Sequence, residues 1–171
     1  MRRTYLCLLL LAFSVSASAQ YHKPWKFRAG AAFYFAPHSI GNNENGIGGL
    51  AGVERSVHRI FSPEAEISYS YFFGDKVSYI NGNNRAFTIP VLLGAKTFLL
   101  PQLYLSPRAG AIYFQLNGMP RSRVSFAYGL ASGLNFPKKT NRLNVQLGYT
   151  GFGNKGVQCG YATLAFAIII N

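Results

Sequence analysis

The sequence predicts an all-β chain, an eight-stranded antiparallel up-and-down transmembrane β-barrel. Three observations support this prediction. Segment after segment alternates large apolar residues with small or charged ones at a period of two, the pattern of a strand with one apolar and one polar face. Charged residues make up only 13% of the chain, against roughly 25% in soluble domains. No apolar run is long enough to span a bilayer as a helix, and only helices and closed barrels satisfy every backbone group in lipid.

The first 19 residues have the features of a secretory signal peptide. Arg2 and Arg3 give the positive start, Leu6–Phe13 is the apolar stretch, and Ala17–Ala19 is a small-residue cleavage site. The apolar stretch is too short for a membrane-spanning helix. We therefore expect residues 1–19 to be removed and residues 20–171 to form one exported barrel domain.

Each of the four N-terminal strands has an apolar face. Trp25–Ala36 carries Phe27, Ala29, Ala31, Phe33 and Phe35 on its apolar face, and Ile47–Val57 is rich in glycine and places Glu54 on its polar face. Arg85–Thr97 alternates in the same way. Phe61–Phe73 has the clearest pattern, with the outward residues Ala65, Ile67, Tyr69, Tyr71 and Phe73. Each strand is long enough for a tilted crossing, which takes roughly 9–11 residues.

The four C-terminal strands continue the pattern. They are Leu103–Leu116, Val124–Phe136, Asn141–Thr150 and Val157–Ile170. The connecting segments carry Gly, Asn and Pro, which are typical turn residues. We expect both termini to lie in the periplasm, so that the first, third, fifth and seventh connectors face outward from the cell.

Alternation alone does not say which face lies inside the barrel, but side-chain volume does. An eight-stranded barrel has an interior just wide enough to be filled by side chains. The apolar face carries too many Phe, Tyr, Leu and Ile residues to fit there, whereas the opposite face carries mainly Gly, Ala, Ser, Asn and a few long charged residues. The apolar face therefore points toward lipid. A soluble lipocalin-like barrel is the alternative and requires the reverse assignment.

The inward face is predicted to hold a network of opposite charges. Its members are Arg28, Glu54, Glu64, Glu66, Lys96, Arg108 and Arg142. Unpaired buried charge is very costly, so four bases and three acids in a narrow lumen are expected to pair. Glu64 and Glu66 also resemble a paired-carboxylate acid–base site, but the structural network is the stronger interpretation.

The chain is strongly basic, with 17 Lys and Arg residues against 5 Asp and Glu residues and a formal net charge of +12. An exported chain does not normally meet nucleic acid, so none is expected as a partner. The nearest anionic partner of an exported barrel is the phosphate of lipopolysaccharide, which arginine forks match. The basic residues in or beside the outward connectors are the candidate contacts: Lys76, Arg85, Arg121, Arg123 and Lys155.

No residue constellation predicts catalysis, a cofactor or a metal site. His22, His38 and His58 lie in a tail and in predicted connectors, and His38 is merely adjacent in sequence to Ser39. Residues 151–156 match G-x-G-x-x-G, but a strand follows where a dinucleotide site needs a helix, so a hairpin loop is expected. The predicted mature chain has a single cysteine and no local metal-ligand pattern.

Three stretches resemble a known family. Residues 46–55 (GIGGLAGVER), 62–71 (SPEAEISYSY) and 88–94 (TIPVLLG) are similar to the second, third and fourth strands of the small outer-membrane β-barrel family of Gram-negative bacteria that includes PorT-type proteins. The resemblance runs from about Phe27 to the end of the chain. It implies the barrel fold and says little about function.

These observations together predict an integral, monomeric outer-membrane barrel of the Gram-negative cell envelope with a side-chain-filled lumen. Its expected role is non-enzymatic, either structural or in surface interaction. Its expected partners are outer-membrane lipids, lipopolysaccharide and, during biogenesis, the barrel assembly machinery. A lipid-modifying enzyme and a narrow, porin-like channel remain as alternatives.

Overall fold

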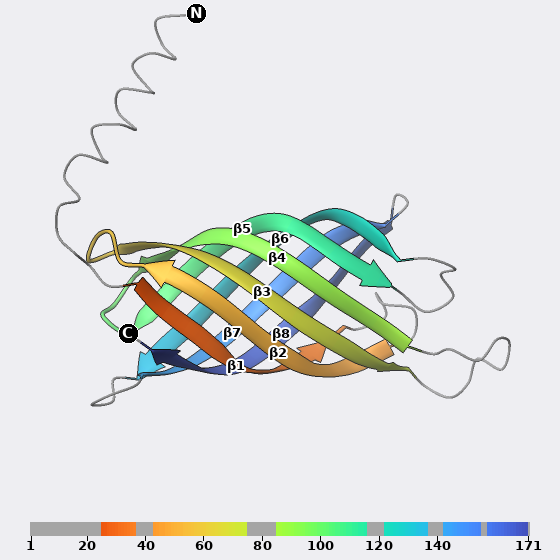
Figure 1. Cartoon of the computed structure of the whole chain (residues 1–171), viewed down its shortest axis with the longest axis horizontal. Coiled ribbons are helices and arrows are strands. Elements are labelled where there is room, and N and C mark those ends of the chain that lie inside the picture. Colours follow the sequence, from red (N-terminus) through yellow and green to blue (C-terminus); the bar gives the residue numbers. More distant parts are fainter. Residues whose placement is uncertain are drawn as a thin grey trace, which may run out of the picture.

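The computed structural model describes residues 25–36, 43–74, 85–115, 122–136, 142–154 and 157–170. They form the strands β1 (Trp25–Phe35), β2 (Asn43–Arg55), β3 (Phe61–Gly74), β4 (Arg85–Phe98), β5 (Leu103–Gln115), β6 (Arg123–Phe136), β7 (Arg142–Asn154) and β8 (Val157–Ile170). Each strand pairs antiparallel with the next, and β1 pairs with β8, so the sheet closes (Figure 1). The predicted eight-stranded up-and-down barrel is confirmed.

Two further points concern the N-terminal segment and the helices of the chain. The predicted signal peptide, residues 1–19, lies outside the described residues. Among the residues that are described, no helix is long and apolar enough to cross a membrane.

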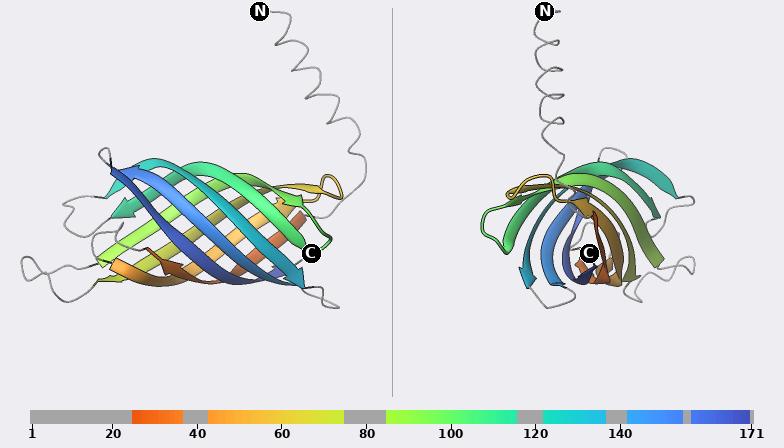
Figure 2. Two further views of the ribbon diagram at one scale, coloured as in Figure 1. Left: turned by 180° about the vertical axis from the view of Figure 1, so that it is seen from behind. Right: turned by 60° about the vertical axis from the view of Figure 1, so that its left-hand side comes forward.

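We name the two ends of the barrel the proximal end and the distal end. At the proximal end, β1 begins and β8 ends, and residues 56–60 and 99–102 join consecutive strands. The distal end is the opposite one (Figure 2). At the proximal end, the Phe98 amide donates to the Ile60 carbonyl at 2.9 Å and the Asn135 amide donates to the Gln102 carbonyl at 2.9 Å. These bonds tie the proximal turns to neighbouring strands.

The strand bounds agree with the sequence prediction to within a few residues, and β8 agrees completely. β2 begins four residues earlier than predicted, at Asn43, and β7 ends four residues later, because it continues through residues 151–154 where the sequence predicts a loop. The backbone ladder persists there because Phe152 pairs with Cys159 and Asn154 with Val157. Phe152 is buried in the interior, so packing extends the strand through a glycine-rich stretch.

The exposed fractions of identical neighbouring residues show which face of each strand points into the barrel. Leu92 is 3% exposed and Leu93 is 65% exposed, and Ile169 is 2% exposed next to Ile168 at 50%. The same alternation holds in β1, where Phe33 and Phe35 are exposed on either side of the buried Tyr34. The apolar face therefore lies on the outside of the barrel, as side-chain volume predicts, and the lipocalin-like assignment is wrong.

The interior has two layers along the barrel axis. In β3 the charged residues Glu64 and Glu66 precede Phe72, and in β1 Arg28 precedes Tyr34. Because both strands begin at the proximal end, a charged layer fills the proximal half and an aromatic layer fills the distal half. A cavity of about 20 Å³ between them is lined by Glu66, Leu92 and other residues of both layers, which is room for about one water molecule.

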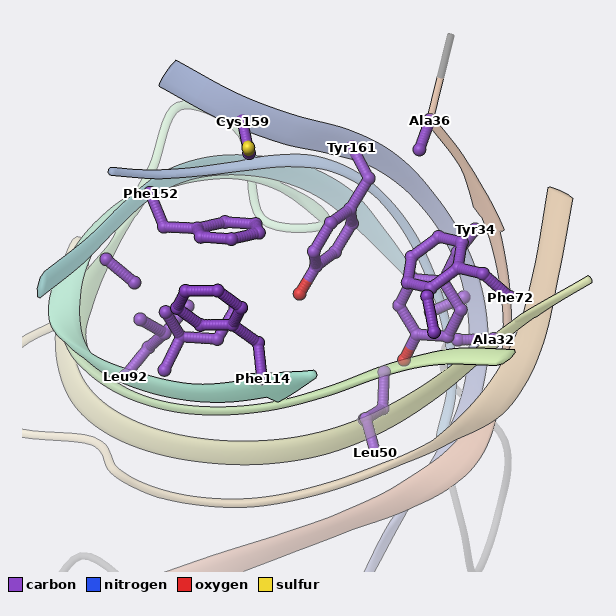
Figure 3. Packing of buried hydrophobic residues seen from close by; sticks show 14 of the residues in the cluster. Ala32, Tyr34, Ala36, Leu50, Phe72, Leu92, Phe114, Phe152, Cys159 and Tyr161 are labelled. Carbon is purple, nitrogen blue, oxygen red and sulfur yellow. The ribbon is translucent and has the colours of Figure 1, made fainter. Parts of the chain in front are cut away.

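The aromatic layer departs from the expectation that the inward face carries mainly small residues and a few charges. Five large rings meet in it: Tyr34, Phe72, Phe114, Phe152 and Tyr161, all at most 3% exposed (Figure 3). Their centroids lie 4.9 Å apart for Phe114–Phe152 and 5.5 Å for Tyr34–Tyr161. Small inward residues, among them Ala86, Ala127 and Ala165, leave the space that these rings occupy.

Candidate functional site in the charged layer

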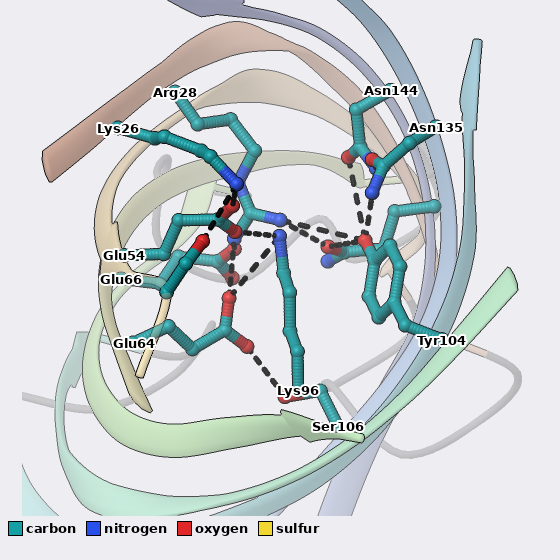
Figure 4. A network of polar contacts seen from close by, with 12 residues as sticks. Lys26, Arg28, Glu54, Glu64, Glu66, Lys96, Tyr104, Ser106, Asn135 and Asn144 are labelled. Carbon is teal, nitrogen blue, oxygen red and sulfur yellow. Dashed lines mark hydrogen bonds and ion pairs between the residues drawn. The ribbon is translucent and has the colours of Figure 1, made fainter. Parts of the chain in front are cut away.

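The charged layer is assembled from strands on all sides of the barrel. β1 supplies Lys26 and Arg28, β2 supplies Glu54, β3 supplies Glu64 and Glu66, β4 supplies Lys96, and β5 supplies Tyr104, Ser106 and Arg108. β6 and β7 complete it with Asn135, Asn144 and Gln146 (Figure 4). Each of these positions lies in the inward phase of its strand, so alternation alone directs the side chains toward the axis.

Glu64 is at the centre of the layer. Its Oε1 accepts from Arg108 Nε at 2.7 Å and from Ser106 Oγ at 2.5 Å, while its Oε2 accepts from Arg28 Nη2 at 3.2 Å. Lys96 Nζ lies 3.6 Å from the same Oε2. Four donors thus converge on one carboxylate that has 1% of its side chain exposed. Such a carboxylate is a structural junction with no oxygen left for a substrate.

The two arginines clamp the second carboxylate of β3. Arg28 Nη2 lies 2.5 Å from Glu66 Oε2, and Arg108 Nη1 lies 2.7 Å from Glu66 Oε1. Both guanidinium groups also donate to Gln146 Oε1, at 2.9 Å and 3.0 Å. Charge-assisted pairs of this kind are stronger than neutral hydrogen bonds, and here they cross-link opposite walls of the barrel.

Glu54 closes the layer on the proximal side. Lys96 Nζ lies 2.5 Å from its Oε2, and Lys26 Nζ lies 3.5 Å from its Oε1. Lys96 is completely buried and its ammonium also sits 4.4 Å from the ring centroid of Tyr104. A cation over an aromatic face is stabilised by the ring quadrupole, so Lys96 is satisfied on two sides.

Tyr104 connects the charged residues to the amide side chains. It is not among the residues predicted for the lumen network. Its hydroxyl donates to Gln146 Oε1 at 3.0 Å and accepts from Asn144 Nδ2 at 3.0 Å. Asn144 Nδ2 also donates to Asn135 Oδ1 at 2.8 Å. The alternation of β5 could have identified Tyr104, because it has the same inward phase as Ser106 and Arg108.

Gly133 makes room for the Tyr104 ring. A Cβ at this position would lie 2.6 Å from Tyr104 Cζ. We therefore expect Gly133→Ala to lower the free energy of unfolding by about 1–3 kcal/mol, the usual cost of overpacking. Urea titrations of the protein folded into lipid vesicles measure this. The matched control is Gly153→Ala, whose new Cβ meets nothing nearer than Ser125 Oγ at 3.9 Å; equal losses in both variants would refute the packing argument.

The structure brings together six of the seven residues predicted for the lumen network and leaves out Arg142. Arg142 is the first residue of β7 and is exposed at the proximal rim. It has no carboxylate partner in the described part of the chain. Its inclusion in the network is wrong. Arg142 has the inward phase of the alternation, but it stands at the end of the strand, where a long side chain reaches solvent and not the packed interior.

The candidate lipopolysaccharide contacts are mostly beyond what the structure describes. Lys76, Arg121 and Lys155 lie outside the described residues, and of Arg85 only the backbone is placed, in β4. Arg123 is half-buried at the distal start of β6. Arg85 and Arg123 thus begin their strands at the distal end of the barrel.

The histidines and the cysteine form no recognisable site in the described residues. His22 and His38 fall outside them, and His58 lies in the exposed turn 56–60, where its Nδ1 accepts from the Ile60 amide at 3.4 Å. Cys159 is buried beside Phe152 in the aromatic layer. Within the described ranges, no group of three or more His, Cys, Asp or Glu residues is placed to hold a metal ion.

Solved structures that are similar to this chain include small outer-membrane barrels. Neisserial surface protein A superposes with a TM-score of 0.62 at 15% identity, covering 85% of this chain and 96% of that one. Ail, the attachment invasion locus protein of Yersinia pestis, gives 0.57 at 16% identity, covering 85% and 97%. The N-terminal barrel domain of Pseudomonas aeruginosa OprF gives 0.51 at 13% identity, covering 85% and 97%. At these identities, the likeness establishes the fold.

Comparison by sequence gives no further assignment. No protein-family profile matches the chain, and no curated protein matches it in sequence. The resemblance to small outer-membrane barrels is thus supported by structure at the level of the fold, and the finer PorT-type grouping remains a prediction.

Proposed function

We propose that the protein is an integral outer-membrane barrel with a closed lumen and a non-enzymatic role, either structural or in surface interaction. The observation that carries this proposal is the filled interior, in which a charged layer and an aromatic layer lie one above the other along the axis. The proposal includes export by the predicted signal peptide and insertion by the barrel assembly machinery.

The outer surface supports membrane insertion. Large apolar side chains are exposed around the whole barrel, among them Phe27, Ile67, Leu93, Phe126 and Leu147, each 48% exposed or more. Soluble proteins rarely expose contiguous apolar patches larger than a few hundred Å². Strands of 11 to 14 residues also meet the roughly 9–11 residues that a tilted transmembrane strand needs.

The carboxylates of the charged layer argue against an acid–base enzyme. Both oxygens of Glu64 and both of Glu66 are engaged by Arg28, Lys96, Arg108 or Ser106. A catalytic carboxylate needs an oxygen within reach of the proton that it transfers. The same ion pairs cross the lumen and obstruct the path that water and ions would take through it, which argues against a channel.

Planar-bilayer recording tests the closed lumen. We expect the wild-type protein to show no steady conductance, because the ion pairs and rings fill the described interior across the barrel axis. Arg108→Ala removes the group that joins Glu64, Glu66 and Gln146, so we expect intermittent leaks from that variant. Arg55→Ala, outside the lumen beside Trp25, serves as the control and should stay closed. Discrete, ion-selective steps in the wild type would contradict the proposal and favour a narrow channel.

We further propose that the basic distal residues contact lipopolysaccharide phosphate. Reversing two charges together, Arg121→Glu with Arg123→Glu, should weaken lipopolysaccharide binding by the detergent-solubilised protein. The effect should shrink in high salt, because exposed charges are screened beyond about 8 Å at physiological ionic strength. Arg55→Glu, at the proximal end, is the control and should bind as the wild type does. Unchanged binding of the double variant at low salt would reject this contact.

A further inference from the structure

The proximal end of the barrel opens into a cavity of about 200 Å³, which we call the proximal mouth. Its inner wall is the edge of the charged layer, formed by Lys26 and Glu54. Arg59 and His58 from the turn between β2 and β3 and Arg142 from the start of β7 also line it. The mouth is smaller than the roughly 300–1,000 Å³ of typical small-molecule pockets, so it suits a compact ligand.

Among the described residues, the positive charges of the mouth outnumber its acids. Lys26, Arg59 and Arg142 supply three basic side chains, and the single acid among the described lining residues is Glu54. Both oxygens of Glu54 are already engaged, one by Lys26 at 3.5 Å and the other by the buried Lys96 at 2.5 Å. Within the described residues, neither Arg59 nor Arg142 has a carboxylate partner.

Of the two acidic residues outside the charged layer, Glu44 has its backbone in β2 and Asp75 lies outside the described residues. The chain has five acidic residues, and three of them lie in the charged layer. Glu44 stands ten residues from Glu54 along β2, toward the distal end. Ten residues of strand span about 33 Å. Among the described residues, Glu54 is therefore the only acid at the mouth.

A buried hydroxyl on the cavity wall points to a ligand independently of charge. Ser62 lines the proximal mouth and is 1% exposed, and its Oγ has no hydrogen-bond partner among the described residues. Buried polar groups are nearly always hydrogen-bonded, so an exception needs an explanation. His58 offers a second donor, because its Nδ1 accepts from the Ile60 amide and its proton then sits on Nε2.

We propose that the proximal mouth binds an oxyanion of the phosphate class, held by the guanidinium groups of Arg59 and Arg142 with Ser62 and His58 as further hydrogen-bond donors. A phosphate group fits this donor set because it presents three or more acceptor oxygens, whereas a carboxylate presents two. Arginine forks match phosphate oxygens in geometry. The mouth opens to solvent, so it admits both a free phosphate and the headgroup of an anionic phospholipid.

Titration of inorganic phosphate into the full-length barrel in zwitterionic micelles tests the proposal, with chloride at equal ionic strength as the reference salt. We expect saturable NMR shifts of the amides of residues 58–62 and of Arg142. The double variant Arg59→Gln with Arg142→Gln should bind at least about tenfold more weakly, as expected when charge-assisted hydrogen bonds are lost. Ser62→Ala should weaken binding by a smaller factor.

The matched control is Arg55→Gln, which removes a proximal arginine whose guanidinium lies over the Trp25 ring, 5.3 Å from its centroid. It should bind phosphate as the wild type does. Shifts that do not saturate, that chloride reproduces, or that persist unchanged in the double variant would overturn the proposal. So would an equal loss in Arg55→Gln, because general surface charge would then explain the binding.

Nanodiscs distinguish the two sources of phosphate. In phosphatidylcholine discs, inorganic phosphate should titrate the same amides as in micelles. If phosphatidylglycerol discs show these amides already shifted and inorganic phosphate no longer titrates them, the occupant is a lipid headgroup. If phosphate titrates equally in both discs, the occupant is a soluble phosphate. Absence of saturable shifts in phosphatidylcholine discs, together with unshifted amides in phosphatidylglycerol discs, would contradict the site.

Discussion

Glu64→Gln will lower the free energy of unfolding by about 3–5 kcal/mol, the usual cost of breaking a buried ion pair by neutralising one partner. Glutamine keeps the size of the side chain and removes only its charge. Arg28, Lys96 and Arg108 all lie within 3.6 Å of the Glu64 carboxylate, so the substitution leaves three buried cations facing two acids. Urea titrations of the protein folded into lipid vesicles measure the loss.

The matched control applies the same chemical change to an acid outside the charged layer. Glu44→Gln lies toward the distal end of the strand that carries Glu54, and its effect should stay within about 0.5 kcal/mol, as for most substitutions away from packed sites. If Glu64→Gln were as mild as Glu44→Gln, the charged layer would not stabilise the barrel, and the account of a cross-linked interior would fail.

Ile67→Arg will cost about 2–4 kcal/mol, the measured range for arginine near the bilayer midplane on the lipid face of a barrel. Ile67 lies at the middle of β3, pairs with Ala51 and Val91, and is 48% exposed on the outer face. In lipid the guanidinium would lose its hydration, whereas on a soluble barrel the same change would place it in water at almost no cost.

Ser68→Ala provides the neighbouring inward position for comparison. Ser68 is buried on the opposite face of β3, and losing its hydroxyl should cost about 1 kcal/mol, the net value of one hydrogen bond. Folding titrations into phosphatidylcholine vesicles give both values. A cost for Ser68→Ala equal to or above that of Ile67→Arg would be inconsistent with an outer face in contact with lipid.

Period-two alternation was sufficient to predict the barrel, the strand positions and the face of most side chains. Its strength is that successive side chains of a strand point to opposite faces, so a pattern such as that of β3 fixes the orientation of Glu64, Glu66 and Ile67 together. Pairing of the inward charges then followed from the cost of isolated buried charge. Six of the seven predicted network residues accordingly lie in one connected layer.

The sequence could not predict features that depend on where along the barrel axis a side chain lies. Arg142 has the inward phase but stands at the rim, so it meets solvent. Tyr34, Phe72 and Phe114 have the inward phase within the distal half of the barrel, where inward alanines leave space for rings. The extension of β7 around Phe152 has the same origin, because packing across the barrel outweighs the turn preference of nearby glycines.

The most direct test of the account is which methyl groups contact lipid in the wild-type protein. Solution NMR in micelles that contain a doxyl-labelled fatty acid measures this without any substitution, because the label broadens the signals of groups that lie in the apolar phase. Matched neighbours give the comparison: Leu93 and Ile168 are exposed on the outer face, and Leu92 and Ile169 are buried in the interior. We predict strong broadening for Leu93 and Ile168 and little for Leu92 and Ile169. Equal broadening within each pair, or the reverse order, would contradict a barrel with an apolar exterior and a closed, charge-filled interior.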